Sequence, residues 1–92
     1  MKLDIFYLKK AEKFFSKNNI ITKDETNTLV IKAIKKIVFK EEVNIDIKRL
    51  KGKLNNFYRI RKANIRILFE LENDKIIIKA IVTDIDFRGS IY

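Results

Sequence analysis

The stretch Tyr58–Glu70, YRIRKANIRILFE, decides how this chain folds. Its apolar residues recur at every second position on either side of Ala63-Asn64, a pattern that predicts two strands joined by a tight two-residue turn. A turn of that length pairs Tyr58 with Phe69, Ile60 with Ile67, and Lys62 with Ile65. One face of the hairpin is then apolar, and other parts of the chain must cover it.

The arginines of the hairpin occupy its opposite face. The same register places Arg61 directly across from Arg66, and Arg59 beside Leu68. Slipping one strand by one residue would turn its arginines into the core, so burial determines the register. Opposed like charges cost roughly a few tenths to 1 kcal/mol. A bound anion would offset that cost, because arginine forms bidentate hydrogen bonds to phosphate. The alternative is that the arginines extend into solvent and pair with Glu70.

A further strand is predicted over residues 75–82, after a second two-residue turn at Asn73-Asp74. The expected pairs are Glu72 with Lys75, Leu71 with Ile76, Phe69 with Ile78, Ile67 with Ala80, and Ile65 with Val82. On the arginine face, this register puts Ile81 beyond Arg66 and Lys79 beside Leu68.

The first half of the chain predicts a short strand over residues 2–6 and two amphipathic helices, over 7–17 and 23–40. Thr22 and Glu25 fit a capping box at the start of the second helix. Together with strands near 57–62, 65–72 and 75–82, this gives the order β-α-α-β-β-β. We therefore expect one α+β domain over residues 1–92, an antiparallel sheet with a two-helix hairpin packed on one face.

The composition restricts the kinds of catalytic and metal-binding sites that the chain can form. The 92 residues include no cysteine and no histidine, so disulfides, thiolate nucleophiles and cysteine zinc sites are excluded, and we expect no metal and no cofactor. Any catalysis must use Lys, Arg, Tyr, Asp or Glu. No apolar run approaches the roughly 20 residues that span a bilayer, and the first residues do not resemble a signal peptide. We expect a cytoplasmic protein without a membrane partner.

The formal net charge is +9, and its distribution is uneven. Eight basic residues and no acidic residue occur between Lys48 and Arg66. A block of this kind indicates a face that binds a polyanion. The alternative is a basic surface that is only solvated.

The segment Leu50–Tyr92, LKGKLNNFYRIRKANIRILFELENDKIIIKAIVTDIDFRGSIY, resembles the RelE/ParE superfamily of bacterial toxin-antitoxin toxins. The shared order is L-x-G, Y-R-I-R, a turn, I-R-I-x-F, a last strand, and R-G-x-x-Y. The resemblance implies the RelE-like fold, an antiparallel sheet backed by two helices. It also implies a partner, a small and acidic antitoxin encoded nearby.

In the RelE branch, the toxin enters the ribosome and cuts mRNA, with the 2′-hydroxyl attacking the adjacent phosphate. The resemblance then implies a catalytic set of Arg59, Arg61, Arg66, Arg88 and Tyr92. The basic residues expected to bind RNA are Lys48, Arg49, Lys51, Lys53, Lys62 and Lys79. Arg61 matches a position implicated in proton transfer, but an arginine side chain is almost never deprotonated in a protein. We therefore expect positioning and charge stabilisation to carry most of the rate.

Asp84 and Asp86 depart from the basic or histidine-containing run that many relatives have at this place. They could act as general bases, or they could be turn residues or partners of nearby lysines and arginines. Three functions stay open: an mRNA endonuclease that works with the ribosome, a ParE-like inhibitor of DNA gyrase, and a nucleic-acid-binding module without catalysis, such as a decayed toxin.

Overall fold

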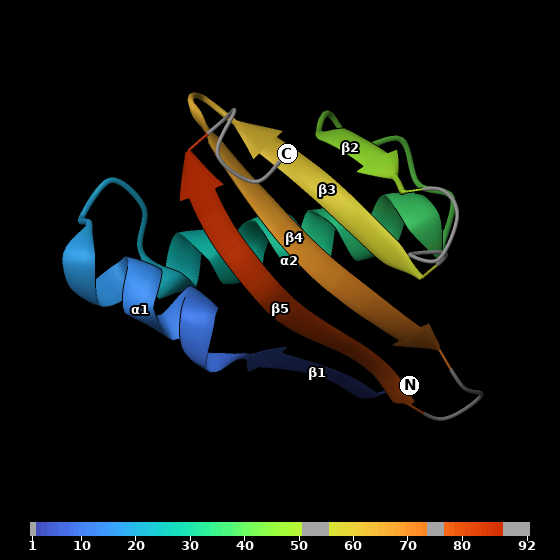
Figure 1. The fold of residues 1–92 in the computed structure, drawn as a ribbon. Coiled ribbons are helices and arrows are strands. Elements are labelled where there is room, and N and C mark those ends of the chain that lie inside the picture. The colour runs from blue at the N-terminus through green and yellow to red at the C-terminus, as the bar shows by residue number, and fades with distance from the viewer. Residues whose placement is uncertain (1, 51–55, 74–76, 88–92) are drawn as a thin grey trace.

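The computed structural model describes residues 2–50, 56–73 and 77–87. Within these ranges two helices and five strands follow one another (Figure 1). They are β1 (Lys2–Tyr7), α1 (Lys9–Lys17), α2 (Lys23–Ile37), β2 (Asp46–Arg49), β3 (Phe57–Lys62), β4 (Ile65–Asn73) and β5 (Ile77–Phe87). The predicted α+β class is confirmed. The strands form one sheet in the order β1-β5-β4-β3-β2, and α2 crosses one of its faces.

The β3–β4 hairpin has the predicted register. Tyr58 pairs with Phe69, Ile60 with Ile67, Arg61 with Arg66, and Lys62 with Ile65. The turn is therefore the two residues Ala63-Asn64. Ala63 adopts a φ of 53°, in the left-handed region that tight hairpin turns require. Glycine would adopt it at lower cost, since a β-carbon in this region costs roughly 1–2 kcal/mol.

The predicted register between β4 and β5 is wrong. Phe69 pairs with Val82, and Asn73 with Ile78, so the second turn is longer than two residues. The shift from the predicted partner of Phe69 is four residues, an even number, which leaves the same side chains on the apolar face. Alternation alone could not distinguish the two registers. The observed one allows β5 to pair as far as Phe87.

A bulge interrupts this pairing between Leu68 and Phe69. Two residues of β5, Thr83 and Asp84, stand between the buried Val82 and Ile85. The hydroxyl of Thr83 donates a hydrogen bond to the Leu68 carbonyl at 3.1 Å. The bulge thus restores the alternation of buried and open side chains along the rest of β5.

The two edge strands differ from the prediction. β1 runs parallel to β5, with Ile5 beside Ala80, so the sheet is mixed, and the expected antiparallel arrangement holds only for the other three strand pairs. Alternation in a strand carries no information on the direction of a distant partner. β2 was not predicted, because Ile47 is the only apolar residue of its four. It pairs antiparallel with β3.

The helices cover the apolar face of the sheet. α1 contributes Ala11 and Phe14 to the core, and α2 contributes Val30, Ala33 and Ile34. The sheet side of the core consists of Ile60, Ile65, Ile67, Phe69, Leu71, Ile78, Ala80, Val82 and Ile85. The predicted helix over residues 23–40 ends earlier, at Ile37. No helix in the described ranges is long and apolar enough to cross a membrane.

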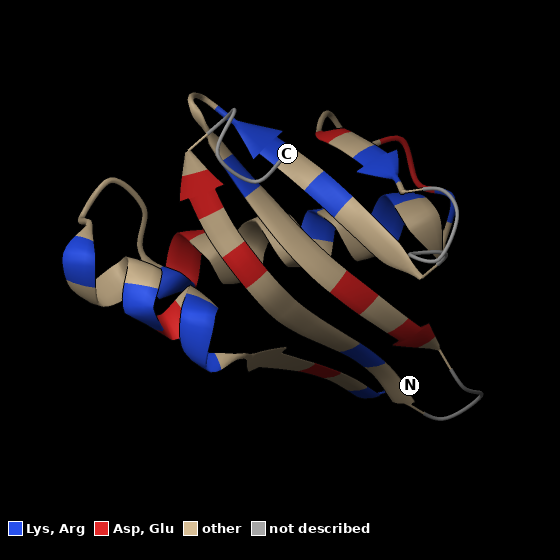
Figure 2. Cartoon of the chain, viewed as in Figure 1, with Lys and Arg blue, Asp and Glu red and all other residues tan. Residues whose placement is uncertain are grey.

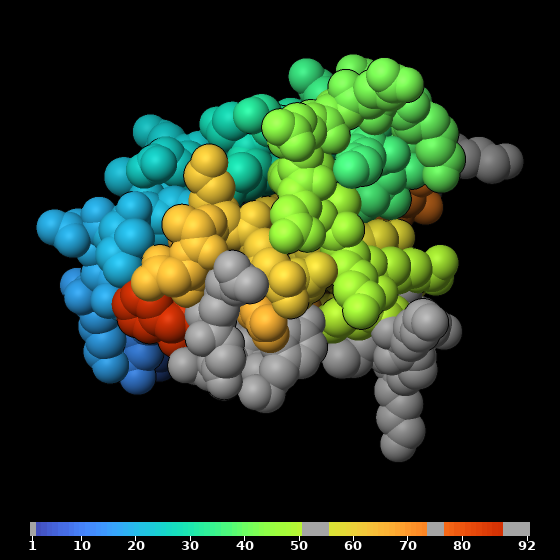
Figure 3. Space-filling model, turned by 90° about the horizontal axis from the view of Figure 1, so that it is seen from above, coloured from blue at the N-terminus to red at the C-terminus, as the bar shows by residue number. Residues whose placement is uncertain are grey.

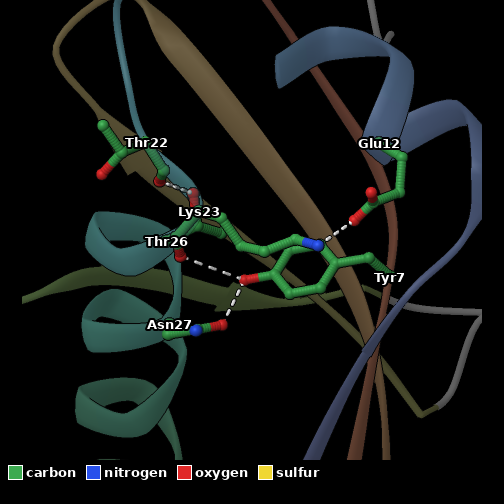
Figure 4. A network of polar contacts seen from close by, with 6 residues as sticks. All are labelled: Tyr7, Glu12, Thr22, Lys23, Thr26 and Asn27. Atoms are coloured by element: carbon green, nitrogen blue, oxygen red, sulfur yellow. Dashed lines mark hydrogen bonds and ion pairs between the residues drawn. The ribbon is translucent and has the colours of Figure 1, made fainter. Parts of the chain in front are cut away.

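The start of α2 has the predicted capping box. The Thr22 hydroxyl accepts from the backbone N–H of Glu25, and the Glu25 carboxylate accepts from that of Thr22, both at 3.1 Å. Next to it, the Tyr7 hydroxyl donates to the side-chain oxygen of Asn27 (Figure 4). The Lys23 ammonium lies 5.0 Å from the centre of the Tyr7 ring.

This network joins β1 and both helices, because Lys23 also forms an ion pair with Glu12 of α1. Burial raises the pKa of Tyr7 to about 12, and the charges of Glu12 and Asp24 add to the effect. The two helices are thereby held on one side of the sheet, and no helix of the described residues covers the opposite face.

Candidate nucleic-acid interface

The open face of the sheet presents three arginines from the central hairpin. Because Tyr58, Ile60 and Ile67 face the helices, the alternate residues Arg59, Arg61 and Arg66 project the other way. β2 adds Lys48, which pairs with Arg59. A hollow of about 300 Å³ is lined by Lys48, Leu50, Arg59, Arg61 and Arg66. Figure 2 shows these basic positions on the neighbouring strands β2, β3 and β4.

Arg59 forms the buried part of the hollow. The residue is 6% exposed, although burying a guanidinium group costs free energy unless it is well paired. Its nearest carboxylate is that of Asp46, with Nη2 3.8 Å from Oδ1, and the Asp46 side chain is 57% exposed. Within the described residues, Nη1 of Arg59 and Nε of Arg61 are buried and have no hydrogen-bond partner. The described residues thus leave two guanidinium donors unsatisfied, which is unfavourable for the fold unless a ligand pairs with them.

Carboxylates border the arginines on both sides. In the observed register Asp46 of β2 lies opposite Arg61, and Asp86 of β5 lies opposite Arg66. Asp84 lies opposite Leu68. The prediction that Ile81 and Lys79 occupy the β5 positions opposite Arg66 and Leu68 is therefore wrong, because the β4–β5 pairing is shifted. The sequence also left open a pairing of the arginines with Glu70. The carboxylate partner of Arg59 is instead Asp46 on β2.

Asp84 and Asp86 both make structural contacts. Asp84 forms an ion pair with Lys10 of α1 at 3.0 Å. The hydrogen bond and charge of Asp84 raise the pKa of Lys10 above its ordinary value. Asp86 accepts the backbone N–H of Phe87 at 2.8 Å. The ion pair of Asp84 favours the role of partner to a lysine, and both acids lie within β5 and not in a turn.

Other predicted RNA-binding residues lie away from the hollow. Arg49 pairs with Tyr58 and so faces the helix side, and Lys62 lines a separate hollow beside Ile21 and Leu29. Lys79 is on the open face but near β1, 5.6 Å from the centre of the Phe6 ring. The predicted residues that lie outside the described ranges are Lys51, Lys53, Arg88 and Tyr92.

The sequence patterns missed Asp46 and Lys10 as neighbours of the basic face. Neither stands in a motif, and each reaches the face only through a distant pairing, Asp46 through β2 and Lys10 through the contact of α1 with β5. Figure 3 shows the end of β5 lying against α1. In the described part of the chain, no group of three acidic side chains could hold a metal ion.

No protein-family model matches this sequence, and no curated protein matches it significantly. Solved structures do match over nearly the whole chain. A chain of the RelB-RelE antitoxin-toxin complex from Methanococcus jannaschii superposes with a TM-score of 0.58 and 24% identity, covering 95% of this chain and 94% of the other. The YoeB/ParE toxin from Agrobacterium tumefaciens gives a TM-score of 0.65 and 17% identity, covering 96% and 99%.

The chain has the RelE/ParE toxin fold. A point mutant of YafQ from E. coli agrees, with a TM-score of 0.62 and 13% identity over 99% of each chain. The fold implied by the resemblance is thus confirmed over nearly the whole chain. Within the RelE/ParE fold, the arginine hollow occupies the face that the two helices leave open.

Proposed function

We propose that this chain is the toxin of a bacterial type II toxin-antitoxin system and that it cleaves mRNA on the ribosome, as RelE-like toxins do. The observation that supports this most directly is the hollow on the open face, in which a buried Arg59 and the opposed pair Arg61 and Arg66 present guanidinium groups. The RelE/ParE fold supports the same assignment.

The hollow suits the charge of a phosphodiester under attack. Cross-strand neighbours have Cβ atoms about 5 Å apart, so Arg61 and Arg66 can both reach one phosphate. Donors that are fixed before the reaction stabilise the extra negative charge that develops when the 2′-hydroxyl attacks. The three arginines keep their own charge and are proposed to bind and stabilise, with Arg88 and Tyr92 completing the catalytic set. The basic side chain of Lys48 would hold the adjacent backbone.

An antitoxin is the proposed protein partner. One of the similar structures is an antitoxin-toxin complex. The net charge of +9 makes an acidic antitoxin, encoded beside this chain, the complementary choice. Such a partner would cover the arginine hollow and keep the toxin away from RNA and the ribosome.

The test is induced expression of the chain in a bacterial host, followed by mapping of mRNA ends. Growth should stop and translated messages should be cut. The substitutions Arg61→Ala and Arg66→Ala should each abolish cleavage while the protein stays folded, because both side chains leave the core. Lys35→Ala on the exposed side of α2 removes the same charge and should leave cleavage unchanged.

Two outcomes would reject the proposal. Full toxicity of Arg61→Ala would show that the hollow is not the site. Growth arrest with intact mRNA and accumulated gyrase–DNA cleavage complexes would favour a ParE-like gyrase inhibitor instead.

A further inference from the structure

Four cations on the open face form one continuous track across three strands, here called the phosphate track: Arg66, Arg61, Arg59 and Lys48. Arg66 of β4 lies opposite Arg61 of β3, and Arg59 of β3 lies opposite Lys48 of β2. Arg61 and Arg59 are two residues apart on β3, a step of about 7 Å along the strand. Each member of the track is therefore next to another, and all four line the same hollow.

The two cross-strand rows that contain the track both lead to carboxylates among the described residues. The row that crosses the sheet through Arg61 and Arg66 begins at Asp46 and ends at Asp86. The row through Arg59 continues to Leu68 and then Asp84. Figure 2 shows the acidic positions of β5 on one side of the basic ones, and further acidic positions lower on β4.

We propose that Asp46 and Asp86 are specificity residues that confine a single-stranded polyanion to the phosphate track, with its backbone running obliquely from β4 to β2. The proposal rests on the proposed function only in taking a nucleic acid as the ligand. It does not require cleavage.

The physical reason is the small distance between the carboxylates and the track. Neighbouring strands are about 4.8 Å apart, so a backbone crossing the sheet in a straight row would bring its next phosphates over Asp46 or Asp86. Like charges at such distances repel each other measurably even near the surface of a protein. An oblique backbone places successive phosphates over Arg66 and Arg61, then Arg59 and Lys48, and does not pass directly over either acid.

The same arrangement selects against a duplex. A double helix brings a second backbone to the surface, and the described positions that flank the track on β2 and β5 include Asp46, Asp84 and Asp86. We therefore expect the protein to bind a single strand more tightly than the duplex of the same sequence.

The experiment measures binding of a fluorescent 2′-O-methyl RNA oligonucleotide by anisotropy at about 50 mM salt, where phosphate contacts are strong. This probe lacks the attacking hydroxyl, so binding is measured without cleavage, and a failure of the proposed enzyme activity would not affect the result. The variants are Asp46→Asn and Asp86→Asn, which retain the shape of the side chain. Glu42→Gln is the matched control, because it makes the same charge change in the exposed segment between α2 and β2.

Each aspartate variant should bind the single strand about three- to tenfold more tightly than the wild type, and the control should change by less than about twofold. The double variant Asp46→Asn/Asp86→Asn should gain more affinity for the duplex than for the single strand. Thermal unfolding shows whether each variant is folded. If Asp46→Asn is unfolded, the result for Asp86→Asn tests the proposal, because asparagine at position 86 can still accept the Phe87 N–H. Affinities equal to that of Glu42→Gln, or an unchanged preference for the single strand, would overturn the proposal.

Discussion

Replacing Arg59 by methionine should stabilise the fold while it removes binding to a polyanion. Arg59 is 6% exposed, and one of its terminal nitrogens has no hydrogen-bond partner among the described residues. Its ion pair with Asp46 is long, at 3.8 Å, and the aspartate is largely in solvent. The fold therefore bears most of the desolvation cost of a buried guanidinium and recovers little of it. Methionine has a similar length and no charge to desolvate.

The size of the effect follows from this geometry. Replacing a buried ion pair by apolar residues of similar volume is neutral or stabilising by roughly 1–4 kcal/mol. We expect the lower part of that range, about 1 kcal/mol, because the Asp46 carboxylate is already solvated and the Arg59 charge is partly screened. For a domain of this size, 1 kcal/mol corresponds to a rise of about 4–8 °C in Tm. Removing only the carboxylate, in Asp46→Ala, should lower stability by less than about 1 kcal/mol.

The assay is thermal and urea unfolding of the wild type, Arg59→Met and Arg61→Met. Arg61 provides the matched control on the same strand and face, and its residue is less buried than Arg59, so its replacement should change stability less. Oligonucleotide binding measured in parallel should fall in both variants. If Arg59→Met is less stable than the wild type by more than about 1 kcal/mol in urea, Arg59 makes a net stabilising contribution and the reasoning is refuted.

Three further expectations concern the helix side. Tyr7→Phe should lower the free energy of unfolding by about 1 kcal/mol, because Asn27 and the Lys23 carbonyl lose a donor; equal urea midpoints would contradict this. The pKa of Tyr7 is raised to about 12 by burial and by two nearby carboxylates, so its contribution is complete below about pH 10 and is lost as the pH rises toward 12. Stability of the wild type should accordingly fall more steeply than that of Tyr7→Phe between about pH 10 and 12, as urea unfolding across this range would show. Thr22→Ala should cost about 1 kcal/mol through loss of the capping box, whereas Thr22→Ser should retain most of it.

The order of the helices and the central hairpin could be predicted from the sequence because the signals are local. Alternation with a two-residue turn allows one register for β3 and β4, and any slip by one residue would bury an arginine. The capping box at Thr22 likewise needs only residues three apart in the sequence. The opposition of Arg61 and Arg66, on which the proposed site depends, belongs to this locally determined part.

The tertiary structure decided what borders that pair. A shift of four residues in the partner of Phe69 preserves the buried face, so only the full length of β5 and its bulge bring Asp86 beside Arg66. β2 has too few apolar residues to be predicted, yet its pairing brings Asp46 and Lys48 to the arginines. The parallel pairing of β1 with β5 likewise joins segments that are distant in the sequence. The sequence by itself thus determined that arginines meet on an open face, and long-range pairing determined which carboxylates surround them, because no periodic signal specifies a distant strand.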